Sequence, residues 1–251
     1  MKVTVVTVAY NSATTIASCM QSVLNQTFPD IEYIVVDGLS SDNTIGLICE
    51  FEPRFAGRMR WVSEKDAGIY DAMNKGLRMA TGDVVGILNS DDFFTTTDVV
   101  EKVAQAFSDP MLDAVYGDVH FVRESDLTHS VRHYSSAGFR PWWLRFGLMP
   151  AHPSFYVRRE VFEKAGLYKT DYQIGGDFEM MVRLFKRFNI RAKYLNIDFV
   201  TMRTGGVSTK NMGSRLTLLR EDARACRENG LYTHPLLICL KYFYKVLEFR
   251  L

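Results

Sequence analysis

The sequence lacks long apolar runs, closely spaced cysteines and any excess of charge of one sign. No stretch approaches the roughly 20 apolar residues that a membrane-spanning helix needs. The four cysteines, at positions 19, 49, 226 and 239, form no Cys-x-x-Cys pair, which argues against a zinc site or a disulfide scaffold and fits a reducing cytosol. With 30 basic and 29 acidic residues the formal net charge is +1, so we expect no nucleic acid partner.

The N-terminus shows no signal peptide, because residues 2–9 have a strand pattern with no cleavage site. We therefore expect a cytoplasmic protein. The 251 residues, 47% of them hydrophobic, suffice for one large domain or for a domain with an appendage. We find no internal repeat and no low-complexity linker.

Strand and helix patterns alternate through the first half of the chain. Strands separated by helices of this length predict right-handed βαβ units around a mostly parallel sheet, and therefore an α/β fold. The expected strands are residues 2–9, 31–37, 59–62 and 84–88, and the expected helices are residues 14–25, 41–52, 68–79 and 97–107.

The alternation becomes irregular in the second half, where residues 123–150 are polar and predict a long functional or mobile loop. The tail from about residue 212 has a helical pattern that is split at Asn229-Gly230 and at Pro235. Between loop and tail we expect strands at residues 153–157 and 191–200 and helices at residues 160–165 and 175–188.

Two adjacent carboxylates, Asp91 and Asp92, follow the apolar run 84–88, which is typical of a strand buried on both faces. Carboxylates at the C-terminal edge of a central strand lie where open α/β sheets bind ligands. Their oxygen atoms suit Mg²⁺ or Mn²⁺ holding a phosphate-bearing substrate. The alternative is that Ser90, Asp91 and Asp92 only form a turn.

Other polar residues end neighbouring strands and are expected at the same edge. Asp37 can accept hydrogen bonds from a nucleoside, and Tyr10 can stack on its base; the alternatives are a turn aspartate and a half-buried tyrosine. Asp66 follows the third strand, and Asn74 and Lys75 lie on the helix after it. Lys75 can neutralise a diphosphate, although a lone helical lysine is more often solvated.

Asp177 follows two glycines, which let the backbone approach a substrate and leave this carboxylate beside a pocket as a general base. The alternative is a helix N-cap. His152 and the segment 203–208, which includes Arg203, can close over phosphates, and the alternative for His152 is a structural role.

The tail segment 235–247 mixes apolar and aromatic residues with lysines, which suits an interfacial helix at an anionic membrane surface. Trp142 and Trp143 can add an aromatic contact near the acceptor entrance. The alternative is that this helix packs on the domain or forms a dimer.

Taken together and in order, several short motifs resemble glycosyltransferase family 2, whose members have the Rossmann-like GT-A fold. The resemblance covers about residues 3–206. The motifs are residues 5–11 (Val-Val-Thr-Val-Ala-Tyr-Asn), 36–38 (Val-Asp-Gly), 41–44 (Ser-Asp-Asn-Thr), 66–68 (Asp-Ala-Gly), 72–76 (Ala-Met-Asn-Lys-Gly), 80–82 (Ala-Thr-Gly) and 89–92 (Asn-Ser-Asp-Asp).

The resemblance implies roles for four carboxylates. The position matching Asp37 binds the base, usually uracil; the pair matching Asp91 and Asp92 is the Asp-x-Asp-like site whose last residue holds Mn²⁺ or Mg²⁺; the position matching Asp177 is the catalytic base. Gly176 stands where the family often has Glu, and Asn89 stands where it often has Asp. These departures leave the choice of donor less defined.

The implied activity is metal-dependent, inverting transfer of a sugar from a nucleotide-sugar, expected to be a UDP-sugar, to a saccharide acceptor, perhaps lipid-linked, in bacterial polysaccharide assembly. The alternative is a catalytically silent nucleotide-sugar-binding or scaffolding protein.

The expected GT-A domain is residues 1–208, with a nucleotide half at 1–118 and an acceptor half at 119–208, and a helical extension follows at 209–251. We assign Asp92 and His152 to the metal, Thr7, Ala9, Tyr10, Asp37, Asp66, Asn74, Lys75 and Asp91 to the nucleotide, and Trp142, Trp143 and Arg203 to the acceptor or to loop closure.

Overall fold

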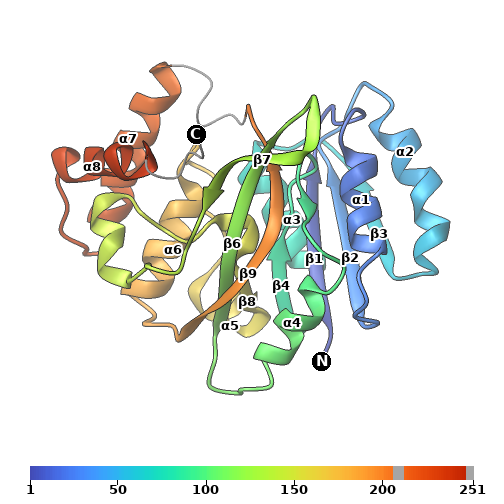
Figure 1. The fold of residues 1–251 in the computed structure, drawn as a ribbon, viewed down its shortest axis with the longest axis horizontal. Helices are drawn as coiled ribbons and strands as arrows, with labels where there is room; N and C mark the ends of the chain where they lie inside the picture. The colour runs from blue at the N-terminus through green and yellow to red at the C-terminus, as the bar shows by residue number, and fades with distance from the viewer. Residues whose placement is uncertain (206–211, 247–251) are drawn as a thin grey trace.

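A computed structural model describes residues 1–205 and 212–246 of the chain. The described strands form one nine-stranded sheet in the order β3-β2-β1-β4-β8-β6-β9-β5, with β7 paired to β6 (Figure 1). The strands are β1 Val3–Ala9, β2 Ile31–Asp37, β3 Met59–Ser63, β4 Val84–Ile87, β5 Phe93–Phe94, β6 Ala114–Arg123, β7 Asp126–Tyr134, β8 Tyr156–Arg158 and β9 Ala192–Arg203.

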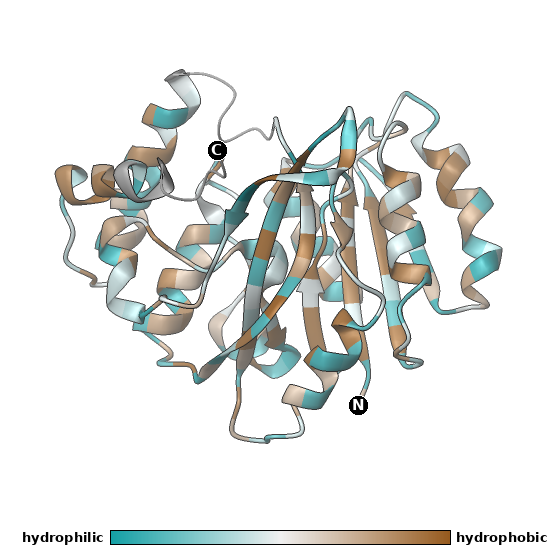
Figure 2. Ribbon diagram, in the orientation of Figure 1, coloured by the Kyte–Doolittle hydropathy of each residue, from teal (hydrophilic) through white to brown (hydrophobic). Residues whose placement is uncertain are grey.

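Strands β3, β2, β1 and β4 are parallel, as the alternating pattern predicts. Every residue of β1, β2 and β4 is buried, because helices cover both faces of this half of the sheet. Figure 2 shows the hydrophobic residues concentrated on these central strands. Six helices flank them: α1 Ile16–Leu24, α2 Thr44–Phe51, α3 Ile69–Met79, α4 Val99–Ala106, α5 Arg159–Ala165 and α6 Gly176–Lys186.

Alternate residues of the central strands belong to two different cores. Val3 and Val5 pack with α1, α2 and α4, whereas Val6 and Val8 pack with α3, α5 and α6. The packing of α3 on β1 is close, since a Cβ atom on Gly76 would lie 2.2 Å from a methyl group of Val6. These two layers fix the carboxyl ends of β1, β2 and β4 at one edge.

The second half of the sheet is mixed. Strand β8 is antiparallel to both β4 and β6, while β6 and β9 are parallel. The α/β fold class is confirmed, with parallel pairing concentrated in the first half.

The prediction of an irregular loop over residues 123–150 is wrong in part. Strand β6 runs on to Arg123 and pairs with β7 in an antiparallel hairpin, followed by the short 3-10 helix η2, Pro141–Phe146. Among the described strands β7 pairs only with β6, and its residues are exposed or half-buried, so its sequence is polar and lacks the apolar run of a central strand. The strand expected at residues 153–157 is also displaced: His152–Ser154 is the 3-10 turn η3, with Pro153 inside it, and β8 begins at Tyr156.

Two further helices follow, α7 Met212–Glu228 and α8 Pro235–Val246, and they confirm the split predicted near Gly230. Ala225, Cys226 and Leu231 belong to the same core as α6. The predicted division at residues 208/209 lies outside the described residues, so it stays a prediction. No described helix is both long enough and apolar enough to cross a bilayer.

Candidate active site

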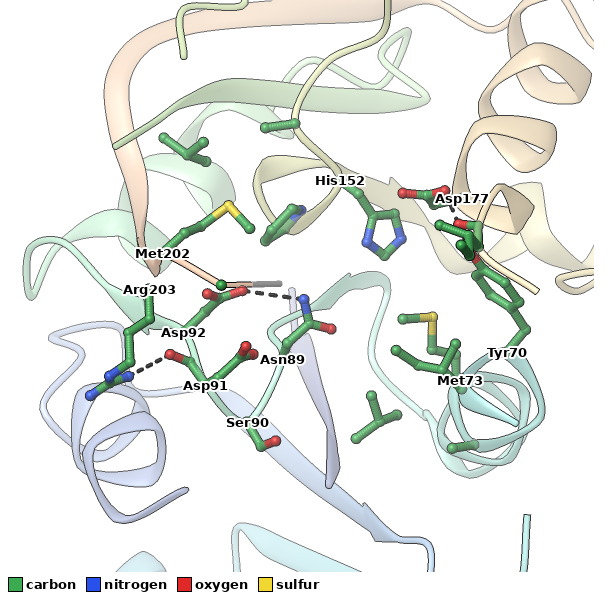
Figure 3. A pocket seen from close by; sticks show the side chains of 18 of the residues that line it. Tyr70, Met73, Asn89, Ser90, Asp91, Asp92, His152, Asp177, Met202 and Arg203 are labelled. Atoms are coloured by element: carbon green, nitrogen blue, oxygen red, sulfur yellow. Dashed lines mark hydrogen bonds between the residues drawn. The ribbon is translucent and has the colours of Figure 1, made fainter. Parts of the chain in front are cut away.

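The carboxyl edge of β1 and β4 opens into a cavity of about 1260 Å³. It lies at the carboxyl ends of the adjacent parallel strands β1 and β4, where the strand order of the sheet reverses. Open α/β sheets bind ligands at this position. Figure 3 shows side chains from both halves of the chain pointing into it. The cavity is lined by the ends of β1 and β4, the start of α3, the β6–β7 hairpin, the start of α6, and residues of α7 and α8.

The acidic pair lies on this edge as predicted. Asp91 is exposed, and Asp92 is 1% exposed. Burial, reinforced by the charge of Asp91, raises the pKa of Asp92 well above its usual value. The Asp92 amide donates to the Asn89 carbonyl (3.0 Å), so the turn is also present.

Asn89 provides the test of whether a cation fits here. Its Nδ2 donates to Asp92 Oδ2 (3.2 Å), while its Oδ1 is buried and has no hydrogen-bond partner among the described residues. An unpartnered amide oxygen beside two carboxylates is a donor set suited to Mg²⁺ or Mn²⁺. The residues present therefore fit a divalent cation, to which Asn89 would contribute an oxygen where the family often has an aspartate.

Arg203 ties the end of β9 to the acidic pair. Its guanidinium donates to the Asp91 carbonyl and to Ser18 Oγ (2.9 Å) and lies 5.2 Å from the ring centroid of Phe93. The predicted closing segment continues through residues 206–208, which lie outside the described residues.

His152 lines the cavity, and Figure 3 draws it between Asp92 and Asp177 in this view. Burial lowers the pKa of its imidazole to about 4, so the ring is neutral near pH 7. Its Nε2 lies 2.8 Å from the Tyr168 hydroxyl. A neutral imidazole is the form that binds metals, so the structure is compatible with the predicted role.

Asp177 lies in the first turn of α6 and faces the cavity. Burial raises the pKa of its carboxyl to about 6, against the opposing effect of the Phe178 amide, which donates to it at 2.8 Å. Gly175, not Asp177, occupies the N-cap position. A carboxyl with this pKa is charged at neutral pH yet still basic enough to accept a proton.

The presence of glycine at position 176, in place of the more usual Glu, has a steric explanation. A Cβ atom at this position would lie 2.7 Å from the Tyr70 ring. The Tyr70 hydroxyl donates to the Ile174 carbonyl and lies 3.5 Å from Asp177 Oδ1. The departure from the family pattern thus makes room for an aromatic ring beside the predicted base.

Glu221 of α7 was not predicted from the sequence. Its carboxylate accepts from the backbone amides of residues 173, 174 and 175 at 2.7, 2.9 and 2.7 Å. Those amides directly precede α6, so Glu221 fixes the start of the helix that carries Asp177.

A buried ion pair between α7 and α8 was also not predicted. Lys241 Nζ lies 2.5 Å from Asp222 Oδ2, with side-chain exposures of 3% and 1%, and both residues line the cavity. The charge of Lys241 opposes the effect of burial on the pKa of Asp177. The tail therefore contributes charged groups to the cavity wall.

Among the predicted nucleotide ligands, Ala9, Tyr10, Asp66 and Asp91 line the cavity, and Tyr10 is 67% exposed. Asp37 is buried beside this edge and is not among the lining residues. Its carboxylate accepts from the Ser40 amide (2.9 Å), the Ser40 hydroxyl and the Ser63 hydroxyl (2.7 Å).

Thr7 and Asn74 have structural partners instead of facing the cavity. The Tyr33 hydroxyl donates to Thr7 Oγ1 (3.1 Å), and Asn74 exchanges two hydrogen bonds of 2.8 Å with the backbone of Tyr168. Neither residue lines the cavity. Asn74 instead joins α3 to the segment before α6.

Lys75 is neither a solvated lysine nor a cavity residue. Its ammonium lies 2.5 Å from Asp66 and 3.0 Å from Glu64, and 3.7 Å from Asp71. Although partial desolvation opposes it, hydrogen bonding to Asp66 and Glu64 raises the pKa of Lys75. Lys75 thus holds Asp66 at the cavity rim.

Trp142 and Trp143 lie on η2 and are not among the cavity-lining residues. Trp142 is 54% exposed and makes edge-on contacts with Trp143 and Phe146. Helix α8 packs against η2. The two tryptophans therefore lie outside the cavity lining, on the element against which α8 packs.

Solved glycosyltransferase structures share this fold. S. aureus TarS in complex with UDP-GlcNAc gives a TM-score of 0.70 at 17% identity, over 90% of this chain and 66% of that one. The mannosyltransferase PcManGT from Pyrobaculum calidifontis, in complex with GDP-Man and Mn²⁺, gives a TM-score of 0.66 at 22% identity, over 90% of this chain and 63% of that one. The fold is therefore the expected GT-A fold.

The model of glycosyl transferase family 2 matches residues 4–188, and this chain belongs to that family. A PGL/p-HBAD biosynthesis glycosyltransferase of Mycobacterium tuberculosis is 29% identical over 188 residues, covering 74% of this chain and 71% of that protein. An uncharacterized glycosyltransferase of the same species is 32% identical over 186 residues, covering 72% and 68%. The family match ends after α6, so Glu221 and Lys241 lie beyond it.

Proposed function

We propose that this chain is a metal-dependent, inverting glycosyltransferase that moves a sugar from a UDP-sugar to a hydroxyl group of a saccharide acceptor. One observation carries the proposal: Asp92 at the end of β4 and Asp177 at the start of α6 line the same cavity. A diphosphate leaving group and an acceptor hydroxyl need two such groups at separate points of one pocket.

The donor side is the edge formed by β1, β4 and the start of α3. The exposed ring of Tyr10 offers a stacking surface for the base, and Asp66 is available for polar contacts at the same rim. We assign Asp37 a role in shaping this edge, since its bonds to Ser40 and Ser63 fix the turn after β2.

Asp91, Asp92, the Asn89 amide oxygen and His152 are the groups that would hold Mn²⁺ or Mg²⁺. A bound cation supplies neutralisation of the negative charge that develops on the diphosphate. Asp177 accepts the proton of the acceptor hydroxyl as that oxygen attacks the anomeric carbon from the side opposite the diphosphate. A single displacement of this kind inverts the anomeric centre.

The donor is tested by a thermal-shift panel of UDP, GDP, dTDP and CMP, each with Mn²⁺ and with EDTA. Ligand at 100 times its Kd stabilises the native state by about 2.7 kcal/mol, so we expect UDP with Mn²⁺ to raise Tm by roughly 5–10 °C for a chain of this size. Asp92→Asn should remove the dependence on Mn²⁺. If UDP raises Tm by the same amount with EDTA as with Mn²⁺, the metal role of Asp92 is contradicted. If no nucleotide raises Tm, the alternative of a silent scaffolding protein is favoured.

We further propose a lipid-linked acceptor in bacterial polysaccharide assembly, with the protein peripheral on the inner face of the cell membrane. The observation that supports it is the outer face of α8, where Leu236 and Leu240 are 72% and 47% exposed, one helical turn apart. Ile238 and Lys241 of the same helix are buried in the protein. The helix can therefore touch a membrane surface without leaving the domain.

Flotation with anionic vesicles tests this membrane contact. We expect the full chain to float and the double variant Leu236→Glu/Leu240→Glu to stay in the soluble fraction, because two charges would be placed in the acyl boundary. Leu127→Glu, which changes an exposed leucine of β7, is the matched control. Equal flotation of all three proteins would contradict the membrane proposal.

A further inference from the structure

Three strands bring two carboxylates and two imidazoles together outside the cavity. Asp118 and His120 lie on β6, His133 lies on β7 and Asp198 lies on β9. In the pairing, His120 is opposite His133, and Asp118 is opposite Asp198. Figure 1 shows β6, β7 and β9 as neighbours in the second half of the sheet.

This cluster lies on the side of the hairpin that faces away from the donor cavity. Val119 and Phe121 of β6 and Tyr134 of β7 line the cavity. Successive side chains of a strand point to opposite faces, so His120 and His133, which alternate with them, point away. The group is therefore separate from the metal ligands proposed at Asp92.

The distances within the cluster are near those between the ligand atoms of a small cation. His133 Nε2 lies 2.9 Å from Asp198 Oδ1 and 3.8 Å from Asp118 Oδ2, and one ligand atom from each of the three residues lies within 4.8 Å of the others. Ligand atoms bound to Zn²⁺ at about 2.1 Å in a tetrahedron are roughly 3.4 Å apart. Small rotations of these side chains would bring all three to that spacing.

Further groups hold the two carboxylates in place. Asp118 accepts from the Ser136 amide (2.6 Å) and the Tyr194 hydroxyl (2.8 Å). His120 Nδ1 lies 3.7 Å from Asp198 Oδ2, and His120 Nε2 lies 3.0 Å from Thr201 Oγ1. Hydrogen-bonded outer residues of this kind orient the ligands of metal sites.

We propose that Asp118, His133 and Asp198 bind one Zn²⁺ ion. Imidazole with carboxylate oxygens is a donor set that zinc takes, and three protein ligands leave a fourth position for water or for His120. His133 and Asp198 are 30% and 38% exposed as side chains, so the ion can enter from solvent.

A cation there joins β7 to β6 and β9. Within the described part of the chain, β7 is paired only with β6, and its other face carries Tyr134 and Arg132, which line the cavity. The zinc site thus fixes the hairpin that forms one wall of the donor cavity, while taking no part in the transfer reaction.

The test is titration of the metal-free full chain with ZnCl₂ by calorimetry and with Co²⁺ by visible absorption. We expect one Zn²⁺ per chain at this cluster, counted in Asp92→Asn so that the proposed cavity site does not contribute, with Co²⁺ bands of a four-coordinate nitrogen and oxygen site. Affinity should fall by roughly 100-fold or more in His133→Gln and Asp198→Asn, because changes outside the ligand sphere already cost 10–100-fold.

Two variants serve as controls. His129→Gln changes an exposed histidine of the same strand, and Asp92→Asn removes the proposed cavity ligand; both should keep this zinc affinity. Absence of Zn²⁺ binding, unchanged affinity in His133→Gln, or loss of binding in Asp92→Asn would each overturn the proposal. The first two results would leave these residues as a hydrogen-bonded His–Asp network only.

Discussion

Asp177→Asn is expected to reduce sugar transfer by about 10³-fold, the middle of the range for loss of a general base, while UDP binding with Mn²⁺ stays unchanged. The amide has nearly the shape of the carboxyl but cannot accept a proton. Because burial raises the pKa of Asp177 to about 6, its charged form is disfavoured by folding. The variant should therefore be at least as stable as the wild type at pH 7.

The same pKa predicts the pH profile of the wild type. Transfer requires the deprotonated carboxylate, so the rate should fall about tenfold for each pH unit below 6 and should level off above about 7. Rates measured with saturating donor between pH 4.5 and 8, with Asp171→Asn as the control for an exposed neighbouring carboxylate, check both statements. Full activity of Asp177→Asn, or a flat profile through pH 6, would remove Asp177 from the role of base.

Glu221→Ala is expected to lower both stability and turnover. The substitution leaves the amides of residues 173–175 without their acceptor, and a buried donor without a partner costs about 1–3 kcal/mol. Because water reaches part of the site, we expect the three amides together to lower the free energy of unfolding by about 3 kcal/mol. This corresponds to a fall in Tm of roughly 10 °C for a chain of this length. Turnover falls as well, since the start of α6 and Asp177 with it lose their fixed position.

Glu221→Gln separates these effects from simple unfolding, because it keeps one of the two acceptor oxygens. It should lie between the wild type and Glu221→Ala in both Tm and turnover. Arg220→Ala changes the exposed neighbour on α7 and should stay within about 0.5 kcal/mol of the wild type. Because the donor edge is formed by other elements, we expect the KM for donor to change little; a large rise in KM with constant kcat would contradict a positioning role for Glu221.

The first half of the fold and the acidic residues of the site were predictable because their signals are local. Strands β1, β2 and β4 are buried on both faces, so their sequences are predominantly apolar. In a parallel sheet, strand ends share one edge, which places Asp91 and Asp92 beside the ends of β1 and β2 without knowledge of the tertiary packing.

Other features depend on partners that are distant in sequence. Asn74 has a polar side chain suited to ligand binding and lies in one of the motifs typical of the family. Its hydrogen-bond partner is nevertheless the backbone of Tyr168, 94 residues away. Glu221 lies on α7, where its carboxylate looks like a solvated helix residue until α6 is packed against it. Strand β7 was not predicted because most of its residues are polar, and a polar strand outside the buried centre of the sheet resembles a loop in sequence.

The contribution of α7 and α8 to the cavity also sets the order in which the site can form. A chain is synthesised from its N-terminus, so the ends of β1 and β4 leave the ribosome well before residue 221. Until Glu221 arrives, the amides before α6 have no carboxylate to bind, and until Lys241 arrives, Asp222 lacks its counter-ion. Under the proposed roles, the nascent chain completes the donor edge first and holds Asp177 in place last, so we expect nucleotide binding to precede competence for transfer.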